Sequence, residues 1–439
     1  MVRRVRTVHT QSAGMTLVEI MITLVISSII AASTFMFFAG QQRIYETQTK
    51  LLNIQQNLWA SMEVLTRYTR ASGSGMYECV HPASYYNATA DNGQRSLSNA
   101  PSQGPLTSSL AVSPQTGIRA FDATSGNMQW IPPLWIVNND TADTATPGVV
   151  ANTDVLTVAF GNRTSGTDVD APISLGFANT AAGTPINLTG TNTGDMFRLG
   201  EFILLLATPN WGYGSDPIID RGCTMFQITT NPASSTTLAH AASAINNGDI
   251  VWNPGNNVAG MLPGGGYTGG SAGVRNFGQL TWVTFFVQTG ANGIPNLMMQ
   301  QRHLAGTSGQ PQILAEGIED LQVSFACDTG SLANQNLTQL NGILDEGTDD
   351  TFKKTDEWWN NVPDDTLPLI NTDGFCNLPT AVRLTLVVRT LTFDDLIDVA
   401  VTANGPMDVE DHRYAPRPKD QFRRRVLTTT VYPRNNKPL

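Results

Sequence analysis

The fold is decided by the stretch SAGMTLVEIMITLVISSIIAASTFMFFAG, residues 12–40. The 24 residues from Met15 to Phe38 contain one charged side chain, Glu19. A helix of this length measures about 36 Å, more than the roughly 30 Å hydrocarbon core of a bilayer. Fourteen residues with three arginines and no acidic residue precede Met15. Because basic flanks stay on the cytoplasmic side of a membrane, the rest of the chain is expected on the opposite side.

A cleavable secretory signal peptide is the alternative for such an N-terminus, and the sequence fits it badly. The apolar run is longer than the usual core of a signal peptide, and no small-residue cleavage pattern follows it. A small residue, Gly14, precedes the run instead. A cut after Gly14 would make Met15 the N-terminus and Glu19 the fifth residue. The Met15 ammonium of a neighbouring copy could then neutralise Glu19, whose carboxylate is otherwise costly inside a membrane.

The motif G-M-T-L-V-E at residues 14–19 follows a basic leader and opens an apolar helix. It resembles the type III signal of type IV prepilins and type II secretion pseudopilins. The resemblance implies that a prepilin peptidase cuts between Gly14 and Met15, and it allows N-methylation of Met15, where the family usually has Phe. It also implies that Glu19 acts in the docking of subunits. The alternative makes Glu19 a water-accessible carboxylate near the cytoplasmic end of an ordinary anchor.

The composition suits an exported, β-rich protein. The 439 residues carry a formal net charge of -10, and only 14% of them are charged. An acidic chain argues against general nucleic-acid binding, so no specific nucleic-acid partner is predicted. The segment Gly269–Gly273 fits G-x-S-x-G, but it lacks the predicted strand and helix that a nucleophile elbow needs on either side. No metal or nucleotide motif is present, so neither an enzymatic activity nor a cofactor is expected.

The helix is predicted to continue to about Arg70, because no proline occurs before Pro82 and Ser72–Gly75 is a stop signal. Its second half carries an apolar stripe that is expected to pack under a sheet. The stripe comprises Ile44, Leu51, Ile54, Leu58, Met62 and Leu65. Strands are predicted from short apolar or alternating runs at residues 154–160, 201–207, 224–229, 280–288, 297–303, 321–325, 382–390 and 425–432.

The predicted fold class is α+β, with a long N-terminal transmembrane and amphipathic helix packed on an antiparallel β-sheet headgroup, as in pilins. Along the chain we expect a cleaved leader (1–14), a transmembrane or filament-core half of the helix (15–40), an amphipathic half (41–72) and a β-rich head (73–439). Stretches rich in Ser, Thr, Asn and Gly interrupt the head. They are interpreted as loop insertions at about 80–148, 163–196, 246–278 and 328–378.

Blocks of sequence after the helix narrow the resemblance to PilW-type minor pilins. These blocks are ASGSGMYEC (71–79), IIDRGCTMFQIT (218–229), TWVTFFV (281–287), NLMMQQRHL (296–304), ILAEGIEDLQVSFACD (313–328), TAVRLTLVVRT (380–390) and RRRVLTTTVYPRN (423–435). The resemblance implies a structural subunit that helps to prime pilus assembly and sits at or near the filament tip. It implies as partners the major and other minor pilins, the prepilin peptidase, the inner-membrane assembly platform and, before assembly, membrane lipid.

The resemblance also implies a location. The precursor would lie in the inner membrane with its leader in the cytoplasm and its head in the periplasm, and then join the pilus at the cell surface. Two alternatives stay open: a minor pseudopilin at the tip of a type II secretion pseudopilus, and a tip adhesin whose binding module is carried on a pilin stalk.

The chain has four cysteines: Cys79, Cys223, Cys327 and Cys376. Their long spacings and the absence of C-x-x-C argue against zinc binding and thioredoxin-like chemistry. An even number outside the cytoplasm suggests two disulfides, with three possible connectivities. The pairing Cys79–Cys223 with Cys327–Cys376 is favoured, because it would tie the helix end to the sheet and staple the loop between the last two cysteines. Unpaired buried thiols are the alternative.

Charged clusters offer two weaker candidate sites. Asp345, Glu346, Asp349 and Asp350 are candidate calcium ligands, since calcium takes six to eight oxygen ligands. Their spacing matches no EF-hand loop, so a solvated acidic loop is favoured. Arg423–Arg425 could meet phosphates. A solvated edge, or pairing with the protein's own acidic residues, is favoured for these arginines.

Overall fold

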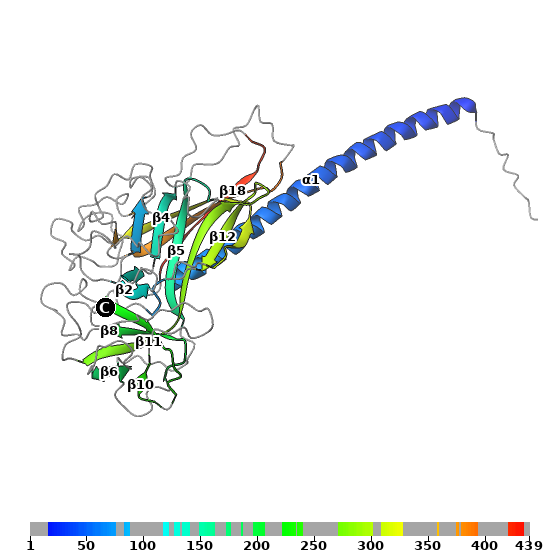
Figure 1. The fold of residues 1–439 in the computed structure, drawn as a ribbon. Helices are drawn as coiled ribbons and strands as arrows, with labels where there is room; N and C mark the ends of the chain where they lie inside the picture. Colours follow the sequence, from blue (N-terminus) through cyan, green and yellow to red (C-terminus); the bar gives the residue numbers. More distant parts are fainter. Residues whose placement is uncertain are drawn as a thin grey trace, which may run out of the picture. The chain divides into compact units, whose positions relative to one another are not determined.

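The structure, a computed structural model, describes part of the chain, and the chain forms two compact units, residues 1–53 and 54–439. The described residues are 16–75, 83–87, 117–122, 127–131, 134–140, 149–162, 173–176, 186–187, 196–206, 222–233, 235–239, 271–301, 309–327, 358–359, 375–376, 379–393 and 420–433. They form one long helix and strands of an α+β fold, which confirms the predicted class (Figure 1).

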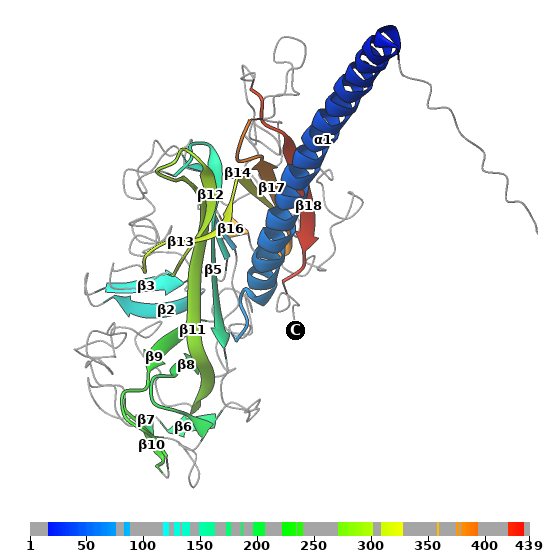
Figure 2. The same ribbon diagram turned by 90° about the vertical axis from the view of Figure 1, so that its right-hand side faces the viewer.

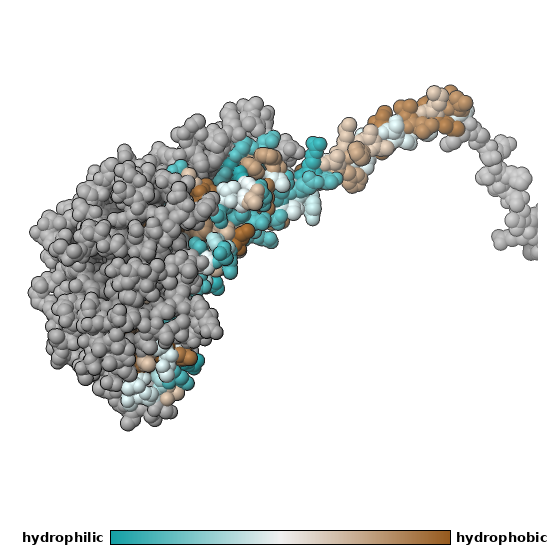
Figure 3. Space-filling model, viewed as in Figure 1, coloured by the Kyte–Doolittle hydropathy of each residue, from teal (hydrophilic) through white to brown (hydrophobic). Residues whose placement is uncertain are grey.

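Helix α1 spans Leu17–Ala71 without interruption, as predicted. Its residues up to Phe38 are almost all apolar, and their side chains are exposed on every side of the helix. Figure 3 shows hydrophobic residues covering the first turns of α1 and hydrophilic residues on later turns. By length and composition the helix can cross a membrane.

The last part of α1 buries one face. Residues Ile54, Leu58, Ser61, Met62, Leu65 and Thr69 are buried. They recur every three or four positions, which is the spacing of one helical face. The Tyr68 ring meets the rings of Phe160 and Phe285 edge to face, at centroid distances of 5.9 and 5.3 Å. The predicted stripe is therefore confirmed from Ile54 onward, but it is wrong for Ile44, which is exposed.

The larger sheet has twelve strands, nine of them in the order β16-β1-β4-β5-β11-β8-β9-β2-β3 (Figure 2). Its members are β1 (Ala83–Asn87), β2 (Gly117–Asp122), β3 (Asn127–Ile131), β4 (Leu134–Asp140), β5 (Thr153–Asn162), β6 (Ile173–Gly176), β8 (Phe202–Leu206), β9 (Gly222–Gln227), β11 (Ser271–Thr289), β12 (Pro295–Gln301), β13 (Gln312–Glu316) and β16 (Phe375–Cys376). Strand β11 joins the two parts of this sheet: its beginning pairs with β6 and β8, and its end pairs with β5 and β12.

A four-stranded sheet has the order β15-β14-β17-β18 and is antiparallel throughout. Its strands are β15 (Trp358–Trp359), β14 (Ile318–Cys327), β17 (Pro379–Arg389) and β18 (Arg424–Val431). A third, two-stranded sheet pairs β7 (Ile186–Asn187) with β10 (Thr237–Leu238). In the larger sheet the pairs β1–β4 and β2–β9 are parallel, so the predicted antiparallel arrangement holds for the other pairs only.

The helix end is joined to β5 by backbone hydrogen bonds. Gly73 N–H donates to the Ala159 carbonyl at 3.0 Å, and Gly161 N–H donates to the Ser74 carbonyl at 2.8 Å. Gly73 has a φ of 70°, in the left-handed region that glycine adopts without strain. A Cβ at Gly161 would lie 2.4 Å from the Phe277 carbonyl oxygen. Glycine at that position therefore lets Phe277 of β11 lie directly against β5.

The loop interpretation of the insertions is wrong at several places. Strands β1 to β4 lie within residues 80–148, β6 and β7 within 163–196, and β15 and β16 within 328–378. Strand β11 begins at Ser271, so Ser271–Gly273 of the G-x-S-x-G segment is strand rather than loop. Some of these strands pair with distant strands, as β1 does with β16 and β6 with β11, and local sequence does not report such pairing. Others pair locally, β2 with β3 and β4 with β5. The eight predicted strands are all present, as β5, β8, β9, β11, β12, β14, β17 and β18.

Candidate functional site

The first described residues of α1 form a reciprocal cap. Thr16 N–H and the Thr16 hydroxyl both donate to Glu19 Oε2, at 3.0 and 3.1 Å. Glu19 N–H donates to Thr16 Oγ1 at 3.3 Å. This is a capping box, in which an N-cap threonine and a glutamate three residues later satisfy each other's backbone donors. Glu19 therefore has an intramolecular role at the start of its own helix.

Thr16 was not predicted as a site residue, although the pattern T-L-V-E at residues 16–19 is the signature of a capping box. The carboxylate of Glu19 was interpreted either as an acceptor for another subunit or as a water-accessible carboxylate, and an acceptor role within its own helix was not considered. Both hydrogen bonds to that carboxylate use Oε2, and no donor in the described part of the chain contacts Oε1. Since an ionised carboxylate offers about four lone-pair sites, Oε1 can accept a further donor. Gly14 and Met15 lie outside the described residues, so the cleavage site and the Met15–Glu19 pairing remain predictions.

Four hydroxyl groups within the apolar part of α1 are satisfied by the helix itself. Thr23 donates to the Ile20 carbonyl at 2.9 Å and Ser28 donates to the Val25 carbonyl at 2.7 Å. Ser33 and Thr34 donate one turn back in the same way, both at 2.8 Å. Bonds of this kind remove hydroxyl donors from the surface. The outside of the helix can therefore face lipid or other apolar helices.

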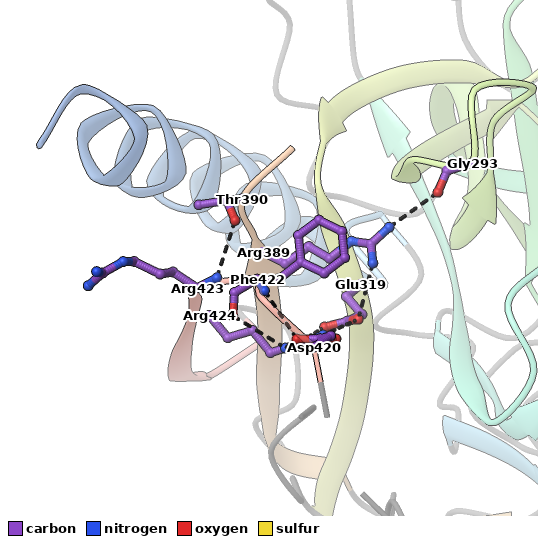
Figure 4. A network of polar contacts seen from close by, with 8 residues as sticks. All are labelled: Gly293, Glu319, Arg389, Thr390, Asp420, Phe422, Arg423 and Arg424. Carbon is purple, nitrogen blue, oxygen red and sulfur yellow. Dashed lines mark hydrogen bonds and ion pairs between the residues drawn. The ribbon is translucent and has the colours of Figure 1, made fainter. Parts of the chain in front are cut away.

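A partly buried ion cluster joins three strands of the four-stranded sheet (Figure 4). Arg424 donates from Nε to Glu319 Oε2 and from Nη2 to Asp420 Oδ2, both at 2.6 Å, and its side chain is 4% exposed. Arg389 lies 3.9 Å from Glu319 and stacks over the Phe422 ring at 4.1 Å. Burial alone would lower the pKa of Arg424, but the hydrogen bonds to Asp420 and Glu319 raise that pKa above its usual value.

The cluster changes the interpretation of the arginine run. Arg424 binds two carboxylates of the protein itself, which agrees with the predicted pairing of these arginines with the protein's own acidic residues. Arg425 is exposed. The run is therefore not a single phosphate-binding surface. Glu319, Arg424 and Asp420 come from β14, the beginning of β18 and the residues just before it, so they fix the start of β18 across the sheet.

The other candidate residues are located by backbone only, or lie outside the described part of the chain. In the strand register, Cys223 of β9 lies opposite Leu206 of β8, and Cys376 of β16 lies opposite Ala83 of β1. Cys327 of β14 lies opposite Pro379 of β17. Cys79 and the candidate calcium ligands Asp345, Glu346, Asp349 and Asp350 are outside the described residues. The two disulfides and the calcium site remain predictions.

Two protein-family models match parts of the chain. Residues 10–35 match the prokaryotic N-terminal methylation motif, and residues 284–435 match the type IV pilus-assembly protein W. The second match runs from within β11 through β18 and so includes the ion cluster. No curated protein and no solved structure matches the chain. Both matched families are structural components of pili rather than enzymes.

The methylation motif, the exposed apolar helix and the β-rich head together define a protein of the type IV pilin class. The helix and the prepilin motif indicate membrane anchoring and association with pili. Within the class the chain is PilW-like, a minor pilin or assembly component of the type IV pilus that interacts with pilins and with the assembly machinery.

Proposed function

We propose that this protein is a minor pilin that helps to prime pilus assembly and sits at or near the tip of the filament. The observation that carries the proposal is the capped apolar start of α1. Its apolar side chains are exposed, and residues 16–53, a single helix, do not cover them. Such a surface needs lipid before assembly and other helices afterwards. The match to the type IV pilus-assembly protein W supports a pilus subunit over a secretion pseudopilin.

Processing would prepare the docking end. A prepilin peptidase cuts between Gly14 and Met15 and leaves an ammonium group on Met15. The hydrogen bonds from Thr16 hold Oε2 of Glu19 toward the helix start, and Oε1 accepts the Met15 ammonium of a neighbouring pilin. A carboxylate in apolar surroundings is costly unless it is paired, so only a correctly positioned neighbour relieves the cost. Glu19 thereby sets the register of docking.

The size of the head supports a place at the tip. The second unit comprises residues 54–439, and a pilin with so large a head would crowd its neighbours if it were repeated along a filament. At the tip no further subunit follows, so the head can extend without a clash. Priming fits the same place, because the subunits that assemble first are those that end at the tip.

The test is to follow Glu19→Ala and Glu19→Gln variants of the full chain in cells that make pili. We expect wild-type protein from membranes and sheared filaments to begin at Met15. Glu19→Ala should be cleaved but reach filaments in much lower amount, and fewer filaments should form. Glu46→Gln is the matched control, since Glu46 is an exposed carboxylate of the same helix beyond the apolar run. A chain that keeps residues 1–14, or one cut beyond residue 38, would refute the proposal.

A further inference from the structure

The four-stranded sheet ends at β18, which has a neighbouring strand on one side only (Figure 2). On that side β18 pairs with β17 over its full length, from Arg424 opposite Arg389 to Val431 opposite Val382, without a register shift. The strand at the other end of the sheet, β15, has only two residues. Strand β18 is therefore a long and regular edge, whose second side can pair with a further strand.

Hydrogen bonds show which backbone groups of β18 point to this outer side. Thr390 N–H donates to the Arg423 carbonyl at 2.9 Å, so Arg423 faces β17, as does every second residue after it. Val426 and every second residue after it therefore direct their N–H and C=O groups away from β17. The Thr385 and Thr428 hydroxyls, 3.0 Å apart, agree with this assignment, because side chains approach most closely at residue pairs without backbone hydrogen bonds.

The outer side of β18 is open. Thr428 and Thr430 are exposed, and Val426 and Leu427 are half-buried, although the residues opposite these last two in β17 are buried. No described residue hydrogen-bonds to the outward N–H and C=O groups of Val426, Thr428 and Thr430. Native edge strands are commonly protected by lysine, proline, a bulge or short length, and residues 426–431 have none of these.

We propose that the outer edge of β18 binds an extended segment of another protein, which adds a strand to the four-stranded sheet. Main-chain hydrogen bonds to Val426, Thr428 and Thr430 hold the segment, and its side chains cover the half-buried Val426 and Leu427. The inference goes beyond the proposed function, and it does not depend on a place at the filament tip.

The charge at the start of β18 defines the chemistry of the partner. Arg424 is bound by Glu319 and Asp420, whereas Arg425 is exposed and forms no ion pair with a described residue. Opposite charges on adjacent strands attract, so the bound segment has a carboxylate beside Arg425 and apolar residues at alternate positions. A second copy of β18 cannot supply that carboxylate, because residues 424–431 include no acidic residue.

The first experiment measures, by fluorescence anisotropy, the binding of a short synthetic peptide to the full chain in detergent micelles. The peptide alternates valine and threonine and has a glutamate at each end, so that a carboxylate meets Arg425 in either strand direction. Two further versions carry N-methyl groups at alternate amides, one version on each edge of the extended peptide. We expect one version to bind on the order of tenfold more weakly, because it loses hydrogen bonds to β18, and the other to bind like the unmodified peptide. Equal binding of the two versions, or no binding of the unmodified peptide, would overturn the inference.

A second experiment changes the edge itself. Thr428→Pro removes an outward N–H without removing a hydrogen bond to β17, and Thr428→Val keeps that N–H as the matched control. We expect Thr428→Pro to bind the peptide on the order of tenfold more weakly, and Thr428→Val to stay within about twofold of wild type. Equal binding by a folded Thr428→Pro would contradict the proposed edge. The N-methyl comparison uses wild-type protein, so it decides the matter if Thr428→Pro does not fold.

Arg425→Glu tests the chemistry of the partner. Wild type should prefer the glutamate peptide to one with lysine in place of glutamate, and Arg425→Glu should reverse this preference. An unchanged preference would contradict the role of Arg425.

Sedimentation of the full chain in micelles tests a second copy as the occupant of the edge. We expect one copy per micelle for wild type and for Thr428→Pro. A wild-type dimer that is lost in Thr428→Pro would show that β18 pairs with itself, and it would overturn the proposed partner.

Discussion

The two ends of helix α1 have the same backbone conformation and opposite relations to the rest of the chain. From Leu17 to Phe38 the apolar side chains are exposed, whereas from Ile54 to Thr69 one face is buried. The first end carries exposed apolar surface of the kind that lipid or another apolar helix can cover. The second end is stabilised within the protein by contacts such as those of Tyr68 with Phe160 and Phe285. We therefore expect substitutions in residues 54–69 to change the stability of the head, and substitutions in residues 17–38 to change assembly and leave that stability unchanged.

The largest effect on the head is expected from Arg424→Met. The Arg424 side chain is buried between Glu319 and Asp420, and its loss leaves two carboxylates without their common partner. We expect a loss of about 3–5 kcal/mol in the free energy of unfolding. The measurement is denaturant unfolding of the full chain in detergent micelles, with Arg425→Met, at an exposed position, as the control. A loss no larger than that of the control would show that the ion cluster does not stabilise the head.

The same pair of proteins predicts a pH dependence. Hydrogen bonds from Arg424 lower the pKa of Asp420 in the folded protein, although burial opposes this. A lowered pKa contributes stability that is present above the unfolded pKa of about 3.9 and is lost as the pH falls through the folded pKa. Between pH 5 and pH 3 wild type should therefore lose more stability than Arg424→Met. Parallel pH profiles for the two would contradict this assignment.

A matched pair of leucines tests the contrast within α1 directly. Leu65 is fully buried, whereas Leu24 is largely exposed. Leu65→Ala should lower the free energy of unfolding of the head by about 2–5 kcal/mol, because it removes buried methyl groups and leaves a cavity. Leu24→Ala should change it by less than about 0.5 kcal/mol, as at other exposed sites. If Leu24→Ala destabilised the head as much as Leu65→Ala, the division of roles along α1 would be wrong.

Local sequence was enough to predict the helix and eight of the strands of this fold. The apolar run and the three- and four-residue spacing predicted α1 to within two residues at its N-terminus, and eight strands had a clear apolar pattern. Strand β1 was not predicted because it pairs with β16 and β4, which lie far away in the sequence. Strands β2 to β4 pair with near neighbours, β2 with β3 and β4 with β5, and the apolar run Leu134–Val137 at the start of β4 was a signal that was not used. Parallel pairing, as in β1–β4, leaves no short turn motif for a sequence to show.

The candidate site was predicted in part for a similar reason. Glu19 was identified because a carboxylate in an apolar run is conspicuous, but its partner Thr16 was not, since a threonine before a helix is ordinary. The ion cluster combines Glu319 with Asp420 and Arg424, which lie about a hundred residues further along the chain. The arginine run 423–425 alone therefore could not indicate which of its side chains is buried. Long-range pairing is information that only the folded chain contains.

A smaller effect is expected where the helix end meets the sheet. Gly161→Ala would place a Cβ 2.4 Å from the Phe277 carbonyl oxygen and 2.7 Å from its ring. The backbone must shift to relieve this, and we expect a loss of about 1–3 kcal/mol in the free energy of unfolding, as for other overpacked sites. Thermal unfolding of the full chain measures it, and Gly40→Ala, where a Cβ has open space, is the control. Equal unfolding temperatures for the two variants would mean that this close approach is not required.

The smallest effect is expected at the other end of α1, where Thr16→Val removes the cap and keeps the shape of the side chain. Glu19 N–H then loses its acceptor and Glu19 Oε2 loses one donor. We expect a local loss of about 1 kcal/mol, as for other N-caps. Amide hydrogen exchange in micelles should show faster exchange at residues 17–20, with the head unchanged, and Thr16→Ser should restore protection because it keeps the hydroxyl. If serine and valine exchanged alike, Thr16 would not hold Glu19. A change in the stability of the head would contradict the separation of the two ends of the helix.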